Sequence, residues 1–496
     1  MKPKRALISV WDKTGIVEFT KELVTLGIEI LATGKTAQIL KDSGIKVLEV
    51  SEWTKSPELL NGRVKTIHPK IAAGILSYRK ESNIEPIDIV VCNLYPFEHY
   101  LKENLAVSDM VELIDIGGVT LLRAAVKNYA FVTAVPKPEF YPLVLKELKE
   151  FGEVSSSTRE LLALKTLEIV AHYDSVIYEY FYRRWQQVDF PEFLTKSYIK
   201  SLPLRYGENP HQKGFFYADP FSNIKINQLW GKELSYNNLL DIDSVIGIIS
   251  EFAETVCAII KHNTPCGVAL GINATDAFRR AFACDPKSAF GGIVGCNQPI
   301  EVETAKAIVE SFFEVIVSPK VSEEALTVFK TKKNLRVVEF SGQLPKLILR
   351  SALGGILIQE RDSTIEDSSN WQLVSESRPT QKQLKDLEFA WRVVKFVRSN
   401  GIVLAKDLRT VGIGAGQMSR VDSVELAIKK AEDLVKGSVM ASDGFFPFRD
   451  SIDIAHNAGV GAIVEPGGSV RDAEVIQACN EYKLPLLFTQ IRHFRH

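Results

Sequence analysis

The sequence predicts an α/β protein with two domains. Short apolar runs alternate with amphipathic helical segments, which is the pattern of βαβ units around a parallel sheet. The chain has 496 residues, more than a single hydrophobic core usually serves. The alternation lapses around Pro191, within residues 188–200, and resumes afterwards, so we expect the main domain boundary there.

The first part of the chain contains five predicted strands. Amphipathic helices are expected between the early strands, at Lys13–Leu26 and at Thr36–Ser43, the second ending at Gly44. A longer helical pattern, rich in aromatic residues, covers Leu161–Trp185. The predicted strands are Arg5–Val10, Ile28–Thr33, Lys46–Val50, Asp88–Leu94 and Phe131–Val135.

The second part alternates in the same way on both sides of a polar stretch at 362–370. Strands are predicted first at Val256–Lys261, Gly292–Gly295, Glu314–Val317 and Leu335–Phe340. After the polar stretch they are predicted at Ile402–Ala405, Thr410–Ile413, Ser438–Ala441, Ala462–Val464 and Pro485–Phe488. The two halves suggest a structural duplication, although the sequence shows no convincing repeat.

Composition excludes several classes of protein. Hydrophobic residues make up 46% and charged residues 24%, with a net charge of −1, so neither a nucleic-acid coat nor an anionic membrane partner is indicated. The early apolar run stops at Asp12 and is predicted as a strand instead of a signal peptide. No apolar run is long enough to span a membrane. The six cysteines form no CxxC pair, which argues against a disulfide framework or a zinc ribbon.

Two glycine-containing turns need interpretation. Gly34-Lys35-Thr36 resembles the end of a P-loop, but that motif requires glycine five residues before the Gly-Lys pair, where this chain has Glu29. An ATPase is therefore rejected. A phosphate-binding turn of another kind and an ordinary strand-to-helix connection both remain open. The GIGAG stretch at 412–416 also lacks dinucleotide-binding spacing and indicates close backbone packing.

Three further clusters have chemical content. The first is Arg63, Lys65 and His68 together with the Asp115-Ile116-Gly117-Gly118 helix start, a set that suits a phosphorylated ligand as well as an ordinary surface. The second is Lys261-His262-Asn263, which ends an apolar strand before a predicted Thr-Pro turn; histidine is the usual general base near neutral pH. The third is the basic tail at 492–496, which follows a strand directly and is either solvent-exposed or docked into a site.

Together these segments resemble the bifunctional purine biosynthesis enzymes, which combine phosphoribosylaminoimidazolecarboxamide (AICAR) formyltransferase with IMP cyclohydrolase. The matching stretches run in the family's order from residue 9 to residue 496. They are SVWDKTG, GRVKTIHPKIAAGIL, CNLYPF, IDIGGVTLLRAAVKN, LRYGENPHQ, KHNTPCG, SNGIVLA, GIGAGQMSR, SDGFFPFRD and IRHFRH.

The resemblance implies a fold and a function for each domain. Residues 1–197 are expected to be a methylglyoxal-synthase-like cyclohydrolase, and residues 198–496 a formyltransferase of two cytidine-deaminase-like α/β/α units. The formyl donor would be 10-formyltetrahydrofolate, which converts AICAR to its formylated product FAICAR before ring closure to IMP. The resemblance also implies a cytoplasmic homodimer with transferase sites shared between subunits. It requires no zinc and is compatible with a potassium ion, for which no ligands can be named.

The resemblance assigns transferase residues position by position. His262 matches the general base that helps the substrate amine attack the formyl carbon, and Lys261 matches the group that stabilises the intermediate or protonates the departing nitrogen. Asn400 matches a residue that positions the formyl group, and Glu314 an acid near the pterin. The other expected binding residues are Arg205, Tyr206, His211, Asn238, Arg420, Phe445, Arg492, Phe494 and His496.

In the cyclohydrolase domain the resemblance gives the catalytic set Lys65, Tyr95, Asp115 and Lys127. The reaction joins the carboxamide nitrogen to the formyl carbon and then loses water, so holding the substrate folded supplies much of the acceleration. The expected nucleotide-binding residues are Ser9, Lys13, Gly34, Thr36, Arg63, Thr66, Gly117 and Gly118. One departure from the family is Lys35, which stands where a second glycine is usual.

Two other functions compete with this reading. A zinc nucleobase deaminase would need H-x-E and P-C-x-x-C, but His262 is followed by Asn263-Thr264, and Pro265-Cys266 lacks the second cysteine. A nucleotide sensor could keep the fold without catalysis. The presence of both catalytic sets argues against such a sensor.

Overall fold

The computed structural model describes residues 2–81, 83–103, 105–186, 190–364 and 368–496, which form two compact units. Unit 1 extends to Ile199 and includes Asp219–Phe221; unit 2 comprises Lys200–Ala218 and Ser222–His496. Part of the predicted boundary segment, residues 187–189, lies outside the described residues. Within the described ranges, no helix is long and apolar enough to cross a membrane.

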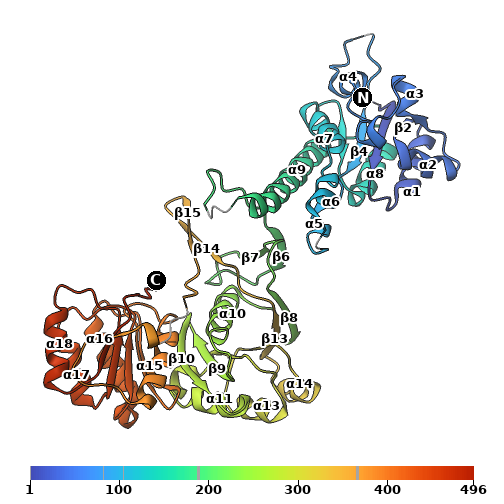
Figure 1. The fold of residues 1–496 in the computed structure, drawn as a ribbon. Coiled ribbons are helices and arrows are strands. Elements are labelled where there is room, and N and C mark those ends of the chain that lie inside the picture. The colour runs from blue at the N-terminus through green and yellow to red at the C-terminus, as the bar shows by residue number, and fades with distance from the viewer. Residues whose placement is uncertain (1, 82, 104, 187–189, 365–367) are drawn as a thin grey trace. The chain divides into compact units, whose positions relative to one another are not determined.

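Unit 1 is built on a five-stranded sheet in the order β3-β2-β1-β4-β5, and every strand pair is parallel (Figure 1). The strands are β1 (Arg5–Val10), β2 (Glu29–Ala32), β3 (Leu48–Glu49), β4 (Ile89–Asn93) and β5 (Thr133–Val135). All five predicted strands are present, with β3 reduced to two residues. Because β2 and β4 lie on opposite sides of β1, the order in which successive strands are added to the sheet reverses between β1 and β4, although all the strands run in the same direction. Ligands typically bind at such a point.

Helices cover both faces of this sheet. Helices α1 (Ile16–Thr25), α2 (Gly34–Asp42) and α8 (Tyr141–Phe151) pack on one face, over alternate β1 residues such as Ile8. Against the other face, where Leu7 points, lie α3 (Val50–Thr54), α4 (Pro69–Leu76), α7 (Gly117–Lys127) and part of α9 (Ser156–Trp185). The remaining helices are α5 (Phe97–Tyr100) and α6 (Val107–Glu112).

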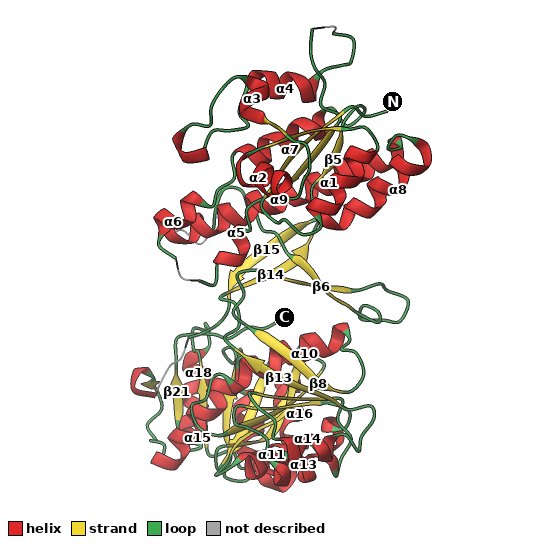
Figure 2. Ribbon diagram, turned by 90° about the vertical axis from the view of Figure 1, so that its right-hand side faces the viewer, coloured by secondary structure: helices red, strands yellow, loops and turns green. Residues whose placement is uncertain are grey.

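Unit 2 contains a twelve-stranded mixed sheet, which Figure 2 shows with helices beside it. Its order, β16-β21-β20-β19-β17-β18-β10-β9-β11-β12-β13-β8, repeats one arrangement on each side of the β18–β10 pair. The first half has β8 (Lys225–Trp230), β9 (Val256–Lys261), β10 (Thr264–Leu270), β11 (Ile293–Cys296), β12 (Val315–Ser318) and β13 (Arg336–Ser341). The second has β16 (Gln372–Leu373), β17 (Ile402–Lys406), β18 (Arg409–Gly414), β19 (Val439–Ser442), β20 (Ala462–Glu465) and β21 (Leu486–Phe488).

Each half consists of an antiparallel hairpin, three parallel strands and an antiparallel edge strand. This is the duplication that the strand pattern suggested. The first half carries α10 (Tyr236–Ile249), α11 (Ala274–Phe282), α12 (Pro286–Ala289), α13 (Val302–Val309) and α14 (Glu323–Phe329). The second carries α15 (Gln381–Val394), α16 (Arg420–Ala431), α17 (Asp450–Ala458) and α18 (Asp472–Glu481).

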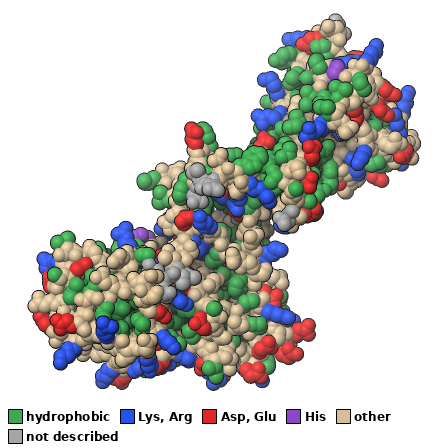
Figure 3. Space-filling model, in the orientation of Figure 1, with side chains coloured by type: hydrophobic (Ala, Val, Ile, Leu, Met, Phe, Trp, Pro, Cys, Tyr) green, Lys and Arg blue, Asp and Glu red, His purple; other side chains and the backbone are tan. Residues whose placement is uncertain are grey.

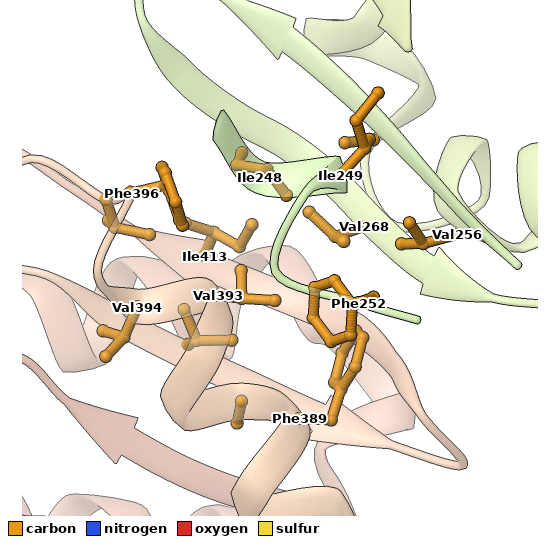
Figure 4. Close-up of a cluster of buried hydrophobic side chains, with 14 of the residues drawn as sticks. Ile248, Ile249, Phe252, Val256, Val268, Phe389, Val393, Val394, Phe396 and Ile413 are labelled. Atoms are coloured by element: carbon orange, nitrogen blue, oxygen red, sulfur yellow. The ribbon is translucent and has the colours of Figure 1, made fainter. Parts of the chain in front are cut away.

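A shared hydrophobic core joins the two halves of unit 2 (Figure 4). Ile248 and Ile249 of α10 lie in one cluster with Val393 and Val394 of α15, and Phe252 packs against Phe389 with ring centroids 5.6 Å apart. Close backbone contact under α16 explains two glycines of the GIGAG stretch. A Cβ at Gly412 would lie 2.1 Å from the Ala427 carbonyl oxygen, and one at Gly414 would lie 1.9 Å from that of Ser423.

The structure corrects the prediction of a Thr-Pro turn after Asn263. Thr264 and Pro265 instead begin strand β10, and the turn consists of His262 and Asn263 alone. The pairing register shifts between Pro265 and Gly267, at an irregularity of the kind where a sheet tolerates proline.

Two small hairpins were not predicted. One pairs β6 (Ile199–Pro203) with β7 (Phe215–Ala218), and the other pairs β14 (Leu347–Ala352) with β15 (Gly355–Glu360). Among the described strands, each of these pairs forms a separate two-stranded sheet.

Candidate active sites

The first candidate site lies at the carboxyl ends of β1 and β4, the reversal point of the unit 1 sheet. Asn93 fixes the loop after β1, because its Oδ1 accepts from the backbone N–H groups of Trp11 (2.7 Å) and Asp12 (2.9 Å) and its Nδ2 donates to the Asp12 carbonyl. Ser9 Oγ lies 3.1 Å from Thr33 Oγ1, at the entry to α2. The sheet therefore brings the predicted residues Ser9 and Lys13 beside the Gly34–Thr36 turn.

Positive charge gathers around this turn. The pKa of Lys13 is lowered, first by burial and then by the charges of Lys65 and Lys35. Gly34 has φ +42° and opens α2, whose cap residue Thr33 makes no side-chain capping bond among the described residues. Free N–H groups and lysines at a helix start favour a phosphate group. The structure thus supports the interpretation of Gly34–Thr36 as a phosphate-binding turn. Lys35, which departs from the family pattern, is one of the three lysines that interact there.

An acidic group faces the same site from the start of α7. Asp115 Oδ1 accepts from Gly118 N at 2.6 Å, and its backbone N–H donates to the hydroxyl oxygen of Tyr173 at 2.8 Å. Burial raises the pKa of Asp115, opposed by the Gly118 N–H and by the charge of Lys65. The pKa of Tyr95 is raised by burial and by the charge of Asp115. Lys65, Tyr95 and Asp115 therefore form one interacting cluster.

The two glycines at the start of α7 are required by close approaches. A Cβ at Gly117 would lie 2.4 Å from Thr66 Oγ1, and one at Gly118 would lie 2.5 Å from Asp115 Oδ2. Thr66 is itself buried. Gly117, Gly118 and Thr66 are thus closely packed at the start of α7, beside Asp115.

Lys127 and Arg63 are the remaining charged residues of the predicted set. Lys127 ends α7, so ten residues of helix place its backbone about 15 Å from that of Gly117. Arg63 is exposed and paired with Glu112, with Nη2 to Oε1 at 2.6 Å. Thr36 lies in the site, but its hydroxyl already donates to the Val10 carbonyl at 3.1 Å. The roles of Lys127 and Arg63 stay predictions.

The second candidate site begins at the β9–β10 hairpin of unit 2. His262 and Asn263 form its two-residue turn with φ of 54° and 59°, which matches the twist of paired strands. Asp241 on α10 fixes the turn by accepting from Asn263 N at 2.6 Å. Lys261 Nζ donates to the Phe290 carbonyl at 2.7 Å. The predicted Lys–His pair thus lies where strand β9 ends and the turn begins, and these two hydrogen bonds hold it there.

A polar network surrounds Asn400 at the start of β17. Arg420 Nη2 donates to Asn400 Oδ1 at 2.8 Å, while its Nη1 donates to Ser442 Oγ at 2.8 Å and to Asp443. Asp443 also accepts from Ser399 Oγ at 2.5 Å. Arg420 and Asp443 are both buried, so this network fixes the guanidinium firmly.

The C-terminal tail is docked on this network. Arg495 N donates to Ser399 Oγ at 3.1 Å, and His493 N donates to the Asp443 carbonyl at 2.9 Å. A Cβ at Gly444 would lie 2.6 Å from both Arg420 Nη2 and Phe494 Cε1, so the Phe494 ring lies beside Arg420. The structure thus favours the docked alternative for the tail.

Hydrogen bonds join the tail to the His262–Asn263 turn. Arg495 Nη2 donates to Ser244 Oγ at 2.9 Å, and Ser244 Oγ lies 3.1 Å from the Asn263 side-chain amide. The antiparallel β10–β18 pairing also places the start of β10 and the end of β18 at the same edge of the sheet. His262 and the Asn400–Arg420 network therefore lie at the same end of these central strands.

A third group of predicted residues surrounds Glu314. Asn238 Nδ2 donates to Glu314 Oε2 at 3.0 Å, and Arg336 Nη1 lies 3.9 Å from the same oxygen. Burial lowers the pKa of Arg336, with smaller effects from Glu314, Arg205 and Tyr206, so these residues lie together. His211, Arg492 and His496 are exposed, and Phe445 is 40% exposed.

Sequence reasoning missed several residues that build these sites. Asn93, Tyr173, Asp241, Arg336 and Asp443 each hold a predicted residue or its loop in place. Asp443 lies within the SDGFFPFRD motif, so its position offered a signal. Asn93 lies within the CNLYPF motif, so its position offered the same kind of signal. Tyr173, Asp241 and Arg336 contact the sites from other strands or helices and become evident only in the folded chain.

Comparison with known proteins identifies the family. The family model described as "AICARFT/IMPCHase bienzyme" matches residues 125–430, and that of the "MGS-like domain" matches residues 15–120. "Bifunctional purine biosynthesis protein PurH" of Persephonella marina is 48% identical over 515 residues, covering 99% of this chain and 100% of the relative. The chain belongs to the AICARFT/IMPCHase bienzyme family.

A second curated relative agrees with this membership. The PurH protein of Caldicellulosiruptor saccharolyticus is also 48% identical, over 99% of this chain and 100% of its own length. A solved structure, described as "Crystal structure of ForH", is 31% identical over 37% of this chain and 100% of that chain. Its TM-score of 0.34 is too low to bear on the fold.

Membership of the bienzyme family confirms the central expectations from sequence. The chain is a bifunctional enzyme with AICAR formyltransferase and IMP cyclohydrolase activities, the last two steps of IMP synthesis, and its formyl donor is 10-formyltetrahydrofolate. The MGS-like match and the parallel sheet confirm the predicted fold class of the N-terminal part. The cytidine-deaminase-like name for the C-terminal part stays a prediction, although the duplication itself is present.

Proposed function

We propose that each unit carries one of the two activities: formyl transfer at the Lys261–His262 turn of unit 2, and ring closure at the Asp115 cluster of unit 1. The observation that carries this division is the presence of two separate polar sites, each within a single unit. The test supplies the half-reactions separately. AICAR with 10-formyltetrahydrofolate should release tetrahydrofolate, and FAICAR alone should give IMP. Failure of both reactions would leave only a nucleotide-binding role.

In the formyl transfer, the substrate amine attacks the formyl carbon and the folate N10 departs. His262, which is exposed on the two-residue turn, takes the proton of the attacking amine. Lys261, held by the Phe290 carbonyl, stabilises the oxyanion or returns a proton to N10. Arg420, with its guanidinium fixed by Asn400 and Ser442, binds the nucleotide.

In the ring closure, the carboxamide nitrogen attacks the formyl carbon and the formyl oxygen leaves as water. The lysines around the α2 start hold the phosphate and keep the flexible substrate folded for attack. Asp115 takes up and returns protons, since burial raises its pKa and thereby favours its protonated form. Lys65 stabilises negative charge on the formyl oxygen.

The homodimer expected from the resemblance is supported by exposed apolar surface on the β14–β15 hairpin. Leu353, Ile356 and Leu357 are 107%, 56% and 62% exposed, and Figure 3 shows green side chains at this hairpin. A two-stranded hairpin is marginally stable alone in water. A second subunit that covers the hairpin would stabilise it and remove the apolar surface from water. A cytoplasmic location also stays a prediction.

Charges on this hairpin are expected to dissociate the dimer. We expect the wild type to sediment as a dimer and Ile356→Asp/Leu357→Asp to sediment as a monomer, because two carboxylates would be buried in an apolar interface. The variant should lose formyl transfer, whose sites are predicted to be shared between subunits, and keep ring closure. Val470→Asp, at an apolar residue 104% exposed elsewhere in unit 2, is the control. A monomeric wild type would contradict the proposal.

A further inference from the structure

Glu465 is a fully buried carboxyl group at the end of β20. Its exposed fraction is 0%, and its Oε2 accepts from the backbone N–H of Phe446 at 2.8 Å. Among the described residues, its Oε1 has no hydrogen-bond partner. Its backbone carbonyl accepts from Thr489 N at 2.9 Å. Glu465 therefore lies between the Ser442–Phe446 loop and the segment that leads into the C-terminal tail.

The surroundings of Glu465 favour its uncharged form. Burial raises its pKa to about 8, and the Phe446 N–H and the charge of Arg420 only partly oppose this effect. The charge of Asp472, on α18, raises the pKa of Glu465 further. The pKa of Cys479, on the same helix, is raised by burial and then by the charge of Glu465. An uncharged carboxyl is much less costly to bury than a carboxylate with one unpaired oxygen.

The loop that Glu465 supports carries the predicted nucleotide site. Ser442 and Asp443 bind the Arg420 guanidinium, and Phe445 immediately precedes the anchored Phe446. The Phe494 ring packs over Gly444 in the same loop. A change in the charge of Glu465 therefore acts on Arg420 and on the loop that fixes it.

We propose that Glu465 is a positioning residue for formyl transfer, acting as an uncharged carboxylic acid that supports the Ser442–Phe446 loop, and that its ionisation weakens binding of the phosphorylated substrate. An ionised Glu465 would compete with Asp443 for Arg420 and would add negative charge beside the site of an anionic ligand. The proposal rests on the assignment of formyl transfer to unit 2.

The test compares pH profiles of wild type and Glu465→Gln, which keeps the size of the side chain and the acceptor for Phe446 N but cannot ionise. Glu465 loses its proton as the pH rises through about 8. The wild-type-to-variant ratio of kcat/KM for AICAR should therefore fall about tenfold between about pH 7 and about pH 9. The fall should appear in KM, because the proposal concerns substrate binding. Taking the ratio cancels the effect of groups that titrate in both proteins.

Three further measurements make the outcome decisive. Glu425→Gln, at an exposed position on α16, should give a ratio that does not change with pH. Ring closure from FAICAR should be unchanged in all three proteins. Because the folded chain holds the Glu465 proton to a higher pH than the unfolded chain does, the wild type should lose thermal stability relative to Glu465→Gln as the pH rises from about 5 to about 8.

A constant ratio across the pH range would overturn the proposal, as would a Glu465→Gln variant that folds but lacks formyl transfer at pH 7. The pH dependence of AICAR binding, measured by calorimetry, separates this proposal from the assignment of function. If the wild type bound AICAR without transferring a formyl group, the assignment of formyl transfer would fail. The binding ratio would still test Glu465.

Discussion

Replacement of His262 by alanine is expected to abolish formyl transfer and to leave ring closure unchanged. The amine of AICAR is a weak nucleophile because its lone pair is delocalised into the ring and the carboxamide. A positioned general base contributes about 10²–10⁴-fold to such a reaction, and the kcat of formyl transfer should fall by that factor. Release of tetrahydrofolate from 10-formyltetrahydrofolate measures the loss.

His262→Asn separates the base from the turn. His262 has a positive φ of 54°, which asparagine adopts readily and which alanine disfavours. Asparagine should therefore preserve the β9–β10 hairpin and the Asp241 contact while removing the base. We expect the same loss in both variants. Substantial formyl transfer by His262→Asn would show that His262 shapes the turn and is not the base.

Replacement of Asp115 by asparagine is expected to stop ring closure and cause FAICAR to accumulate. The amide oxygen of asparagine can still accept from Gly118 N, so the start of α7 should be preserved. The variant loses the group that exchanges protons with the substrate, and we expect a loss of about 10²–10⁴-fold in the rate of ring closure. Formation of IMP from supplied FAICAR gives this rate directly.

The control for this variant is Asp109→Asn, at an exposed residue of the neighbouring helix α6. It should retain both activities. Near-normal ring closure in Asp115→Asn would remove Asp115 from the mechanism. Lys127, at the other end of α7, would then remain as a predicted catalytic residue of the ring closure.

The alternation of apolar strands and helices was enough to predict most of the sheet in each unit. The predicted bounds of β1 coincide with the observed Arg5–Val10. These strands are buried on both faces, so they appear in the sequence as continuous apolar runs. Helix α9 begins earlier than predicted, at Ser156, where the Ser155 side chain accepts from Thr158 N. That capping residue lies before the apolar periodicity begins.

The missed elements depend on tertiary structure. Strand β10 contains Pro265, which favours a turn in sequence but is accommodated beside the register shift before Gly267. The β14–β15 hairpin turns at Leu353-Gly354, both with positive φ, and its exposed apolar residues lack the alternation of a half-buried strand. Neither feature follows from local pattern.

The candidate sites were predicted chiefly from the family motifs, supported by local pattern. His262 was singled out at the end of an apolar strand, although its tight turn was not foreseen, and Asp115 at a predicted helix start; the resemblance supplied their catalytic roles. Asp443 and Arg336, in contrast, act through contacts with residues more than 20 positions away in the chain. Such partners follow from the fold and not from spacing in the sequence.

The central claim, that one chain carries two independent sites used in sequence, is tested most directly by mixing His262→Ala with Asp115→Asn. Each variant alone should fail to convert AICAR and 10-formyltetrahydrofolate to IMP. Asp115→Asn still makes FAICAR and His262→Ala still closes its ring, so the mixture should form IMP. A mixture that forms none, although each variant folds and binds nucleotide, would contradict the two-site account.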